Sequence, residues 1–133
     1  MKKTLGLFLL LFNLCLCSPQ QKQELIEDTT TEKEAVYYVK YASDGIRGAY
    51  NVEYTLESGK KQALPNMDGD TFERTVGPVS KGFVANYSIA PHVSTCIVNA
   101  RIEVKKDDSP FVVKAETVSK TAGQPVKLSY TIE

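Results

Sequence analysis

The segment TCIVNARIEVKK, residues 95–106, constrains the fold more than any other part of the chain, because its side chains alternate in character. One face carries the apolar residues Cys96, Val98, Ala100, Ile102 and Val104. The opposite face carries Ile97, Asn99, Arg101, Glu103 and Lys105, of which all but the first are polar. Side chains alternate between two faces in a β-strand but follow a period of about 3.6 residues in a helix. The pattern therefore predicts a long strand that turns one face toward the core.

Two other segments show the same alternation, and shorter apolar runs accompany them. In FVANYSIA, residues 83–90, the predicted inward face is Phe83, Ala85, Tyr87 and Ile89. In VKLSYTIE, residues 126–133, it is Val126, Leu128, Tyr130 and Ile132. Shorter strands are predicted at residues 36–41, 50–56, 72–76 and 111–118. The first two of these are expected to form a hairpin around Asp44 and Gly45, because Asp-Gly is a favoured hairpin dipeptide.

Turn-forming residues separate the predicted strands. Clusters of Gly, Pro, Asn and Asp recur at intervals of roughly 8–12 residues, which is typical of β-sandwiches and barrels. No stretch after residue 34 shows a helical period of apolar side chains. We therefore predict an all-β fold, a single immunoglobulin-like antiparallel β-sandwich of seven to eight strands over residues 35–133.

The N-terminal segment MKKTLGLFLLLFNLCLC, residues 1–17, has the composition of an export signal. Lys2 and Lys3 precede a run that is almost wholly apolar. At about 1.5 Å per residue this run spans roughly 18 Å, which is too short for the ~30 Å hydrocarbon core of a membrane. A basic start, a short apolar run and small residues at its end predict a signal peptide.

Two cleavage sites fit this signal, and the sequence leaves both open. Ordinary signal peptidase would cut before Ser18, with Cys15 and Cys17 as the small residues at −3 and −1. A lipoprotein peptidase would cut before Cys17 and leave it as a lipidated N-terminus, although Leu16 stands where the bacterial lipobox has a small residue. Cys17 is thus a candidate lipidation site and membrane tether. The pair of cysteines is not predicted to form a metal or redox site.

Residues 18–34 are mostly polar and are predicted to be a flexible linker, because they offer too little apolar surface to offset the entropy of ordering. We expect an exported protein, periplasmic or at the cell surface, that is either lipid-anchored or soluble.

Removal of Lys2 and Lys3 lowers the 16 basic residues to 14, against 16 acidic residues. This weakly negative charge excludes a nucleic-acid partner. Cys96 would be the only cysteine left, so no intramolecular disulfide is expected.

Parts of the predicted sandwich resemble the extracytoplasmic domain of the mycobacterial MmpS proteins. The segments are YNVEYTLESGKKQALPNMDGDTFERTV, GFVANYSI and STCIVNARIEVKK. The matching positions are Tyr54-Thr55, Leu64-Pro65 (a turn in the family), Gly82-Phe83 and Thr95-Cys96. The chain departs from the family in having a signal in place of a transmembrane anchor, and in lacking a second cysteine near residue 133. The resemblance implies a sandwich outside the inner membrane and a role as accessory to an envelope transporter.

Three groups of residues are candidate sites. His92 and Cys96 could form a nucleophile pair, but four residues of extended chain span about 13 Å, so we expect a loop histidine and a core cysteine. Residues 66–70, NMDGD, place oxygen-bearing side chains at alternate positions, as calcium loops do. An EF-hand would need a glutamate where the chain has Pro78, and we expect a structural turn. Tyr37, Tyr38 and Tyr41 are candidate ligand contacts, although a core role is expected for most tyrosines.

These observations favour a non-enzymatic binding or accessory module of the cell envelope. The expected partner is another envelope protein, and no cofactor or metal is expected. The alternative is a module that binds a glycan or a lipid through exposed tyrosines and loop residues. A small hydrolase built on His92 and Cys96 is the least favoured class. The sequence leaves the oligomeric state open.

Overall fold

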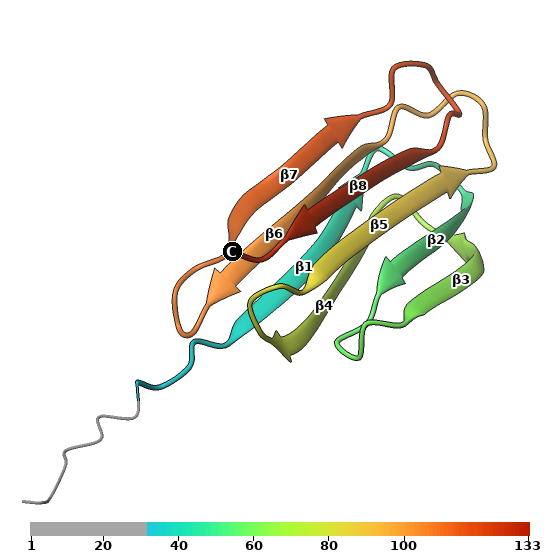
Figure 1. Ribbon diagram of the computed structural model, residues 1–133. Helices are drawn as coiled ribbons and strands as arrows, with labels where there is room; N and C mark the ends of the chain where they lie inside the picture. Colours follow the sequence, from blue (N-terminus) through green and yellow to red (C-terminus); the bar gives the residue numbers. More distant parts are fainter. Residues whose placement is uncertain (1–31) are drawn as a thin grey trace, which may run out of the picture. The chain divides into compact units, whose positions relative to one another are not determined.

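The computed structural model describes residues 32–133, which form two four-stranded antiparallel sheets packed against each other (Figure 1). The predicted signal peptide at residues 1–17, the candidate lipidation site Cys17 and residues 18–31 of the predicted linker lie outside the described residues. The strands are β1 (Tyr37–Asp44), β2 (Ala49–Thr55), β3 (Lys61–Asp68), β4 (Phe72–Val79), β5 (Val84–Pro91), β6 (Asn99–Lys106), β7 (Val112–Val118) and β8 (Val126–Thr131). The predicted all-β sandwich is confirmed.

The two sheets have the strand orders β4-β1-β6-β7, called sheet A, and β3-β2-β5-β8, called sheet B. Only the β2–β3 and β6–β7 connections join neighbours within one sheet, so the other connections cross between the sheets. At one side of the sandwich β7 and β8 run next to each other, although they belong to different sheets (Figure 1). No helix of the described part is long and apolar enough to cross a membrane.

The core lies between the sheets and contains the faces that the alternation predicts. The whole predicted inward face of residues 96–104 is buried, and Ala85, Tyr87 and Ile89 of β5 are buried with it. Phe83 and Leu128 are only partly buried and pack against the core from its margin. The period-2 pattern therefore assigns the inner faces of β5 and β6 correctly, because the face of each side chain is a local property of a strand.

Aromatic rings fill the centre of the core. The Tyr41 ring lies 5.4 Å from the ring centroids of both Tyr54 and Tyr87, and Phe72 lies 5.9 Å from Tyr54 and 6.1 Å from Tyr87. The Tyr41 hydroxyl donates to the Thr55 carbonyl oxygen at 2.8 Å. Burial raises the pKa of Tyr41 above its ordinary value. The core thus gains large apolar rings, while the buried Tyr41 hydroxyl, which would otherwise be costly, has a partner.

The prediction of a hairpin around Asp44 and Gly45 is wrong. β1 pairs with β4 and β6 in sheet A, whereas β2 pairs with β3 and β5 in sheet B. Ile46 is fully buried and its N–H donates to the Asp70 carbonyl oxygen at 3.2 Å. A tight hairpin turn would have exposed Ile46, so burial of this side chain draws the chain across the core instead. Gly45 has φ +78° and lies so close to the Ile97 carbonyl that a Cβ would not fit.

Strand β3 was not predicted, because its alternation is interrupted. A bulge places Pro65 and Asn66 opposite a single residue of β2, and Asn66 has φ +55°. Leu64 and Pro65, expected from the family resemblance to form a turn, lie inside this strand. Proline and a bulge are typical of edge strands, which avoid pairing with other chains in this way. The fold accordingly has eight strands, the upper end of the predicted number.

Candidate functional site

The outer face of sheet B is the candidate binding surface of this protein. The register of the sheet brings Glu53 of β2 opposite Ala63 of β3 and Ser88 of β5. Ser88 in turn lies opposite Lys127 of β8. Small side chains in the middle of the sheet and longer ones around them leave a depression of about 600 Å³. This volume is within the range of ligand pockets, roughly 300–1,000 Å³.

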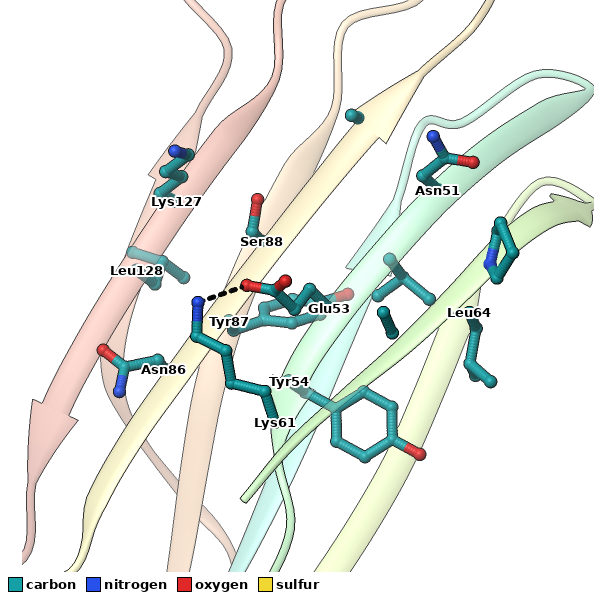
Figure 2. A pocket seen from close by; sticks show the side chains of 14 residues that line it. Asn51, Glu53, Tyr54, Lys61, Leu64, Asn86, Tyr87, Ser88, Lys127 and Leu128 are labelled. Atoms are coloured by element: carbon teal, nitrogen blue, oxygen red, sulfur yellow. Dashed lines mark hydrogen bonds and ion pairs between the residues drawn. The ribbon is translucent and has the colours of Figure 1, made fainter. Parts of the chain in front are cut away.

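Figure 2 shows the polar side chains of this depression. Lys61 of β3 reaches toward β2 and binds the Glu53 carboxylate at 2.8 Å. Asn86, Ser88 and Lys127 project from β5 and β8 beside this ion pair. Within residues 32–133, the side chains of these last three residues form no hydrogen bond or ion pair with another part of the chain. Amide, hydroxyl and ammonium groups are therefore free to bind an external molecule.

The depression presents hydrogen-bonding groups and one ion pair to solvent. Its ion pair is open to solvent, since the Glu53 side chain is 43% exposed and the Lys61 side chain is 68% exposed. Such a pair contributes little to stability and can exchange partners readily. Tyr54 and Tyr87 line the floor, but both are buried, so neither ring is presented at the surface. The arrangement can donate and accept hydrogen bonds around a shallow depression whose lining is largely apolar.

The outer face of sheet A is built differently, because its charged side chains bind one another. The Lys40 ammonium lies 2.8 Å from the Glu103 carboxylate, and Arg101 Nε donates to the same carboxylate at 2.9 Å. Arg101 Nη1 also donates to Asp44 Oδ2 at 2.7 Å. Burial raises the pKa of Glu103, but the hydrogen bonds and charges of Lys40 and Arg101 outweigh it, so the pKa is lowered overall. The central charges of this face, those of Lys40, Arg101 and Glu103, are thus paired with one another.

The structure places the three candidate contact tyrosines in different surroundings. Tyr41 is completely buried among aromatic rings, so the prediction of a ligand contact fails there because its ring belongs to the core. Tyr37 is also buried, at 7% exposure, but lines a second opening between the sheets. Tyr38 is half-buried on the outer face of sheet A, with the Lys105 ammonium 5.0 Å from its ring centroid. The three do not form one exposed row.

His92 and Cys96 are placed as a loop residue and a core residue. Cys96 is buried, and its thiol donates to the Val93 carbonyl oxygen at 3.2 Å. His92 is exposed, and its backbone N–H donates to the Ala49 carbonyl oxygen at 2.8 Å. The thiol is thus bonded to the backbone rather than to the imidazole.

Residues 66–70 end strand β3 and lead into β4. The Asn66 N–H donates to Asn51 Oδ1 at 3.0 Å, which holds the bulge against β2. Asp68 is the last residue of β3, and the loop that follows contains Gly69 with φ +142°. No group of three His, Cys, Asp or Glu side chains in residues 32–133 is placed to hold a metal ion. The segment itself forms the end of β3 and the turn into β4.

Comparison with known proteins adds no family to this description, since no protein-family model and no curated protein matches the sequence. The resemblance to the MmpS proteins consequently stays an expectation from sequence. The polar face of sheet B was missed by the sequence analysis, because its residues come from four strands whose pairing is set by long-range contacts. The one local signal was the alternation of Asn86 and Ser88 with buried neighbours.

Proposed function

We propose that the protein is an exported, non-enzymatic module of the cell envelope that binds a partner protein through the outer face of sheet B. The observation that carries this proposal is the depression beside the Glu53–Lys61 pair, where Asn86, Ser88 and Lys127 have no partner within residues 32–133. Export is inferred from the sequence of residues 1–17. An envelope transporter is the partner that the resemblance implies.

The contrast with sheet A supports the choice of face. The charges of sheet A are bound to one another, so a partner would have to break those pairs before binding. Polar groups on the outer face of sheet B are hydrated, and a partner would replace water with its own hydrogen bonds. Protein interfaces commonly contain about ten direct hydrogen bonds together with bridging water. A shallow depression with an apolar lining and polar groups around it is suited to such an interface.

Site-specific photocrosslinking in intact cells tests this proposal. A photoreactive residue at Ser88 should give a discrete adduct with a membrane protein, and the same residue at Thr75 on the outer face of sheet A should not. Thr75 is a matched control, because it is exposed and lies next to Lys40 in the sheet register. The substitution Ala63→Arg should abolish the Ser88 adduct by filling the depression. Equal adducts from both faces, or none from Ser88, would contradict the proposal.

Glycan binding is the second candidate, and it is favoured by the amide and hydroxyl groups of Asn86 and Ser88. Sugar-binding sites commonly add an aromatic ring that stacks on the sugar, yet Tyr54 and Tyr87 are buried beneath the depression. A glycan ligand would therefore depend on hydrogen bonds alone. Soluble envelope polysaccharide that suppresses the Ser88 adduct with protein, and that binds to purified protein, would favour the glycan over the protein partner.

A further inference from the structure

A second opening lies between the two sheets, where β6, β7 and the end of β8 meet. Its volume is about 420 Å³. The apolar part of its lining comes from both sheets and consists of Tyr37, Val104, Val112, Tyr130 and Ile132. Three lysines, Lys81, Lys106 and Lys114, surround this apolar surface together with one carboxylate, that of Glu133. The opening thus has a mixed lining, in which Tyr37, Val104 and Ile132 are buried and Val112 is exposed, and a positively charged rim.

Lys106 is the last residue of β6 and is exposed, so its ammonium lies at the rim of the opening. It continues the inward register of Ile102 and Val104 on β6, and it lies directly opposite the buried Tyr37 in the sheet. A lysine at such a position can lay its methylene stem along apolar surface and keep its ammonium in water. Inward lysines often protect the exposed edges of sheets, but β6 lies between β1 and β7 and has no free edge. Edge protection therefore does not explain Lys106.

The other two lysines approach the same opening from different elements. Lys114 is the extra residue of a bulge in β7, between the positions that pair with Ile102 and Glu103. Lys81 lies in the loop between β4 and β5. Within residues 32–133, none of the three lysines forms an ion pair. Their charges are not neutralised by an ion pair with the described residues, and the single Glu133 in the lining leaves the rim positively charged.

Backbone hydrogen bonds hold the walls of this opening in place. The Gly82 N–H donates to the Ile132 carbonyl oxygen at 2.8 Å, and the Ile132 N–H donates to Phe83 at 3.0 Å. These bonds fix the Lys81 loop against the end of β8. On the other side, the Asp107 N–H donates to the Val36 carbonyl oxygen at 2.8 Å, which anchors the residue after Lys106. The backbone next to Lys81 and Lys106 is therefore held in place by hydrogen bonds.

We propose that this opening binds a single-chain anionic amphiphile of the fatty-acid type. The carboxylate would lie among Lys81, Lys106 and Lys114, and the acyl chain would enter the gap between the sheets against Val104 and Ile132. The positive charges of the three lysines favour an anion, and the apolar part of the lining favours an acyl chain. The volume is near the lower end of the range for ligand pockets, roughly 300–1,000 Å³, which suits one chain rather than two. The site is separate from the outer face of sheet B.

Titration of the purified full chain with dodecanoate, followed by the backbone amide signals, tests this inference. Saturable shifts are expected at Val112 and Ile132. Butyrate, which has the carboxylate without the chain, and dodecyltrimethylammonium, which has the chain with the opposite charge, should not produce them. In a series from octanoate to dodecanoate, each methylene that becomes buried should strengthen binding about fourfold.

Paired lysine variants separate a specific site from general electrostatic attraction. The double variant Lys106→Gln/Lys114→Gln should weaken dodecanoate binding about tenfold, as expected for two partly exposed charge pairs. The control Lys60→Gln/Lys120→Gln removes the same charge from exposed loop positions and should bind as the unmodified protein does. Thermal unfolding would show that each variant is folded. If a variant unfolds, the chain-length series on the unmodified protein still tests whether the opening binds the acyl chain.

Several outcomes would overturn the inference. They are the absence of saturable binding, equal binding of the cationic amphiphile, or equal weakening by the Lys60 and Lys120 variant. Lysine-dependent binding to phosphatidylglycerol vesicles without binding of free dodecanoate would assign the basic rim to a membrane surface instead. The Ala63→Arg variant should bind dodecanoate normally, so failure of this inference and failure of the proposed partner surface can be distinguished.

Discussion

The outer faces of the two sheets use charged residues in opposite ways. On sheet A, the Glu103 side chain is only 12% exposed and binds both Lys40 and Arg101, forming a chain of ion pairs that extends to Asp44. On sheet B, Glu53 binds one lysine and is far more exposed. Partly buried pairs in a network are held by several hydrogen bonds, whereas solvent screens isolated exposed pairs. Sheet A therefore uses its charges for stability, and sheet B keeps its polar groups available.

The largest expected difference in stability between the two faces follows removal of one carboxylate from each face. Glu103→Ala should lower the free energy of unfolding by about 2 kcal/mol, because it leaves two partly buried cations without their shared partner. Glu53→Ala should change it by less than about 0.5 kcal/mol, because its pair is exposed. Denaturant unfolding of both variants measures the contrast. Equal losses from the two substitutions would show that the faces do not differ in this respect.

A smaller loss is expected when the Lys40 ammonium is removed but its stem is kept. Lys40→Met should destabilise the fold by about 1 kcal/mol, since it removes the ion pair with Glu103 and the contact with the Phe111 ring, whose centroid lies 4.9 Å away. Glu103 retains its bond to Arg101, which limits the effect. The matched variant on sheet B, Lys127→Met, should leave the free energy of unfolding unchanged. A larger loss from Lys127→Met would reverse the comparison.

The pH dependence of stability should also reflect sheet A. Desolvation raises the pKa of Glu103, but Lys40 and Arg101 lower it by more, so the folded value lies below the unfolded one. The contribution of Glu103 to stability is therefore complete above the unfolded carboxyl pKa, about 4.3, and is lost as the pH falls through the lower folded value.

Glu103→Gln isolates this contribution. Between pH 7 and about pH 3, the variant should lose less free energy of unfolding than the unmodified protein, because one linked carboxylate has been removed. Glu53→Gln serves as the control and should follow the curve of the unmodified protein. Parallel curves for all three proteins would argue against a special role for Glu103.

Sequence alone predicts what is local in this fold. The inward face of residues 96–104 follows from alternation, and the whole face is buried. Strand pairing does not follow from alternation, because most connections cross between the sheets and the neighbours of each strand come from distant segments. The hairpin expected at Asp44 and Gly45 failed for this reason: burial of Ile46 outweighed the turn preference of the dipeptide.

The candidate sites were predictable only in part, and for the same reason. The depression on sheet B needs Ala63, Ser88 and Lys127 on one surface, which requires β3, β2, β5 and β8 to be neighbours. For the opening between the sheets, the sequence contains one local signal. Lys106 continues the alternation of residues 96–104 by one further step, so a lysine at the exposed end of that face could have been noticed from the sequence.

The smallest expected change in stability concerns the polar groups of sheet B. The double variant Asn86→Ala/Ser88→Ala should alter the free energy of unfolding by less than about 0.5 kcal/mol, as is usual for surface positions without internal partners. The backbone of Asn86 remains bonded to the Thr55 hydroxyl, which accepts the Asn86 N–H at 3.0 Å, so β5 keeps its place in the sheet. Partner binding should nevertheless weaken, because the complex loses two hydrogen-bonding side chains. A variant that unfolds more easily yet binds its partner normally would assign these residues to stability, and the two faces would then serve the same purpose.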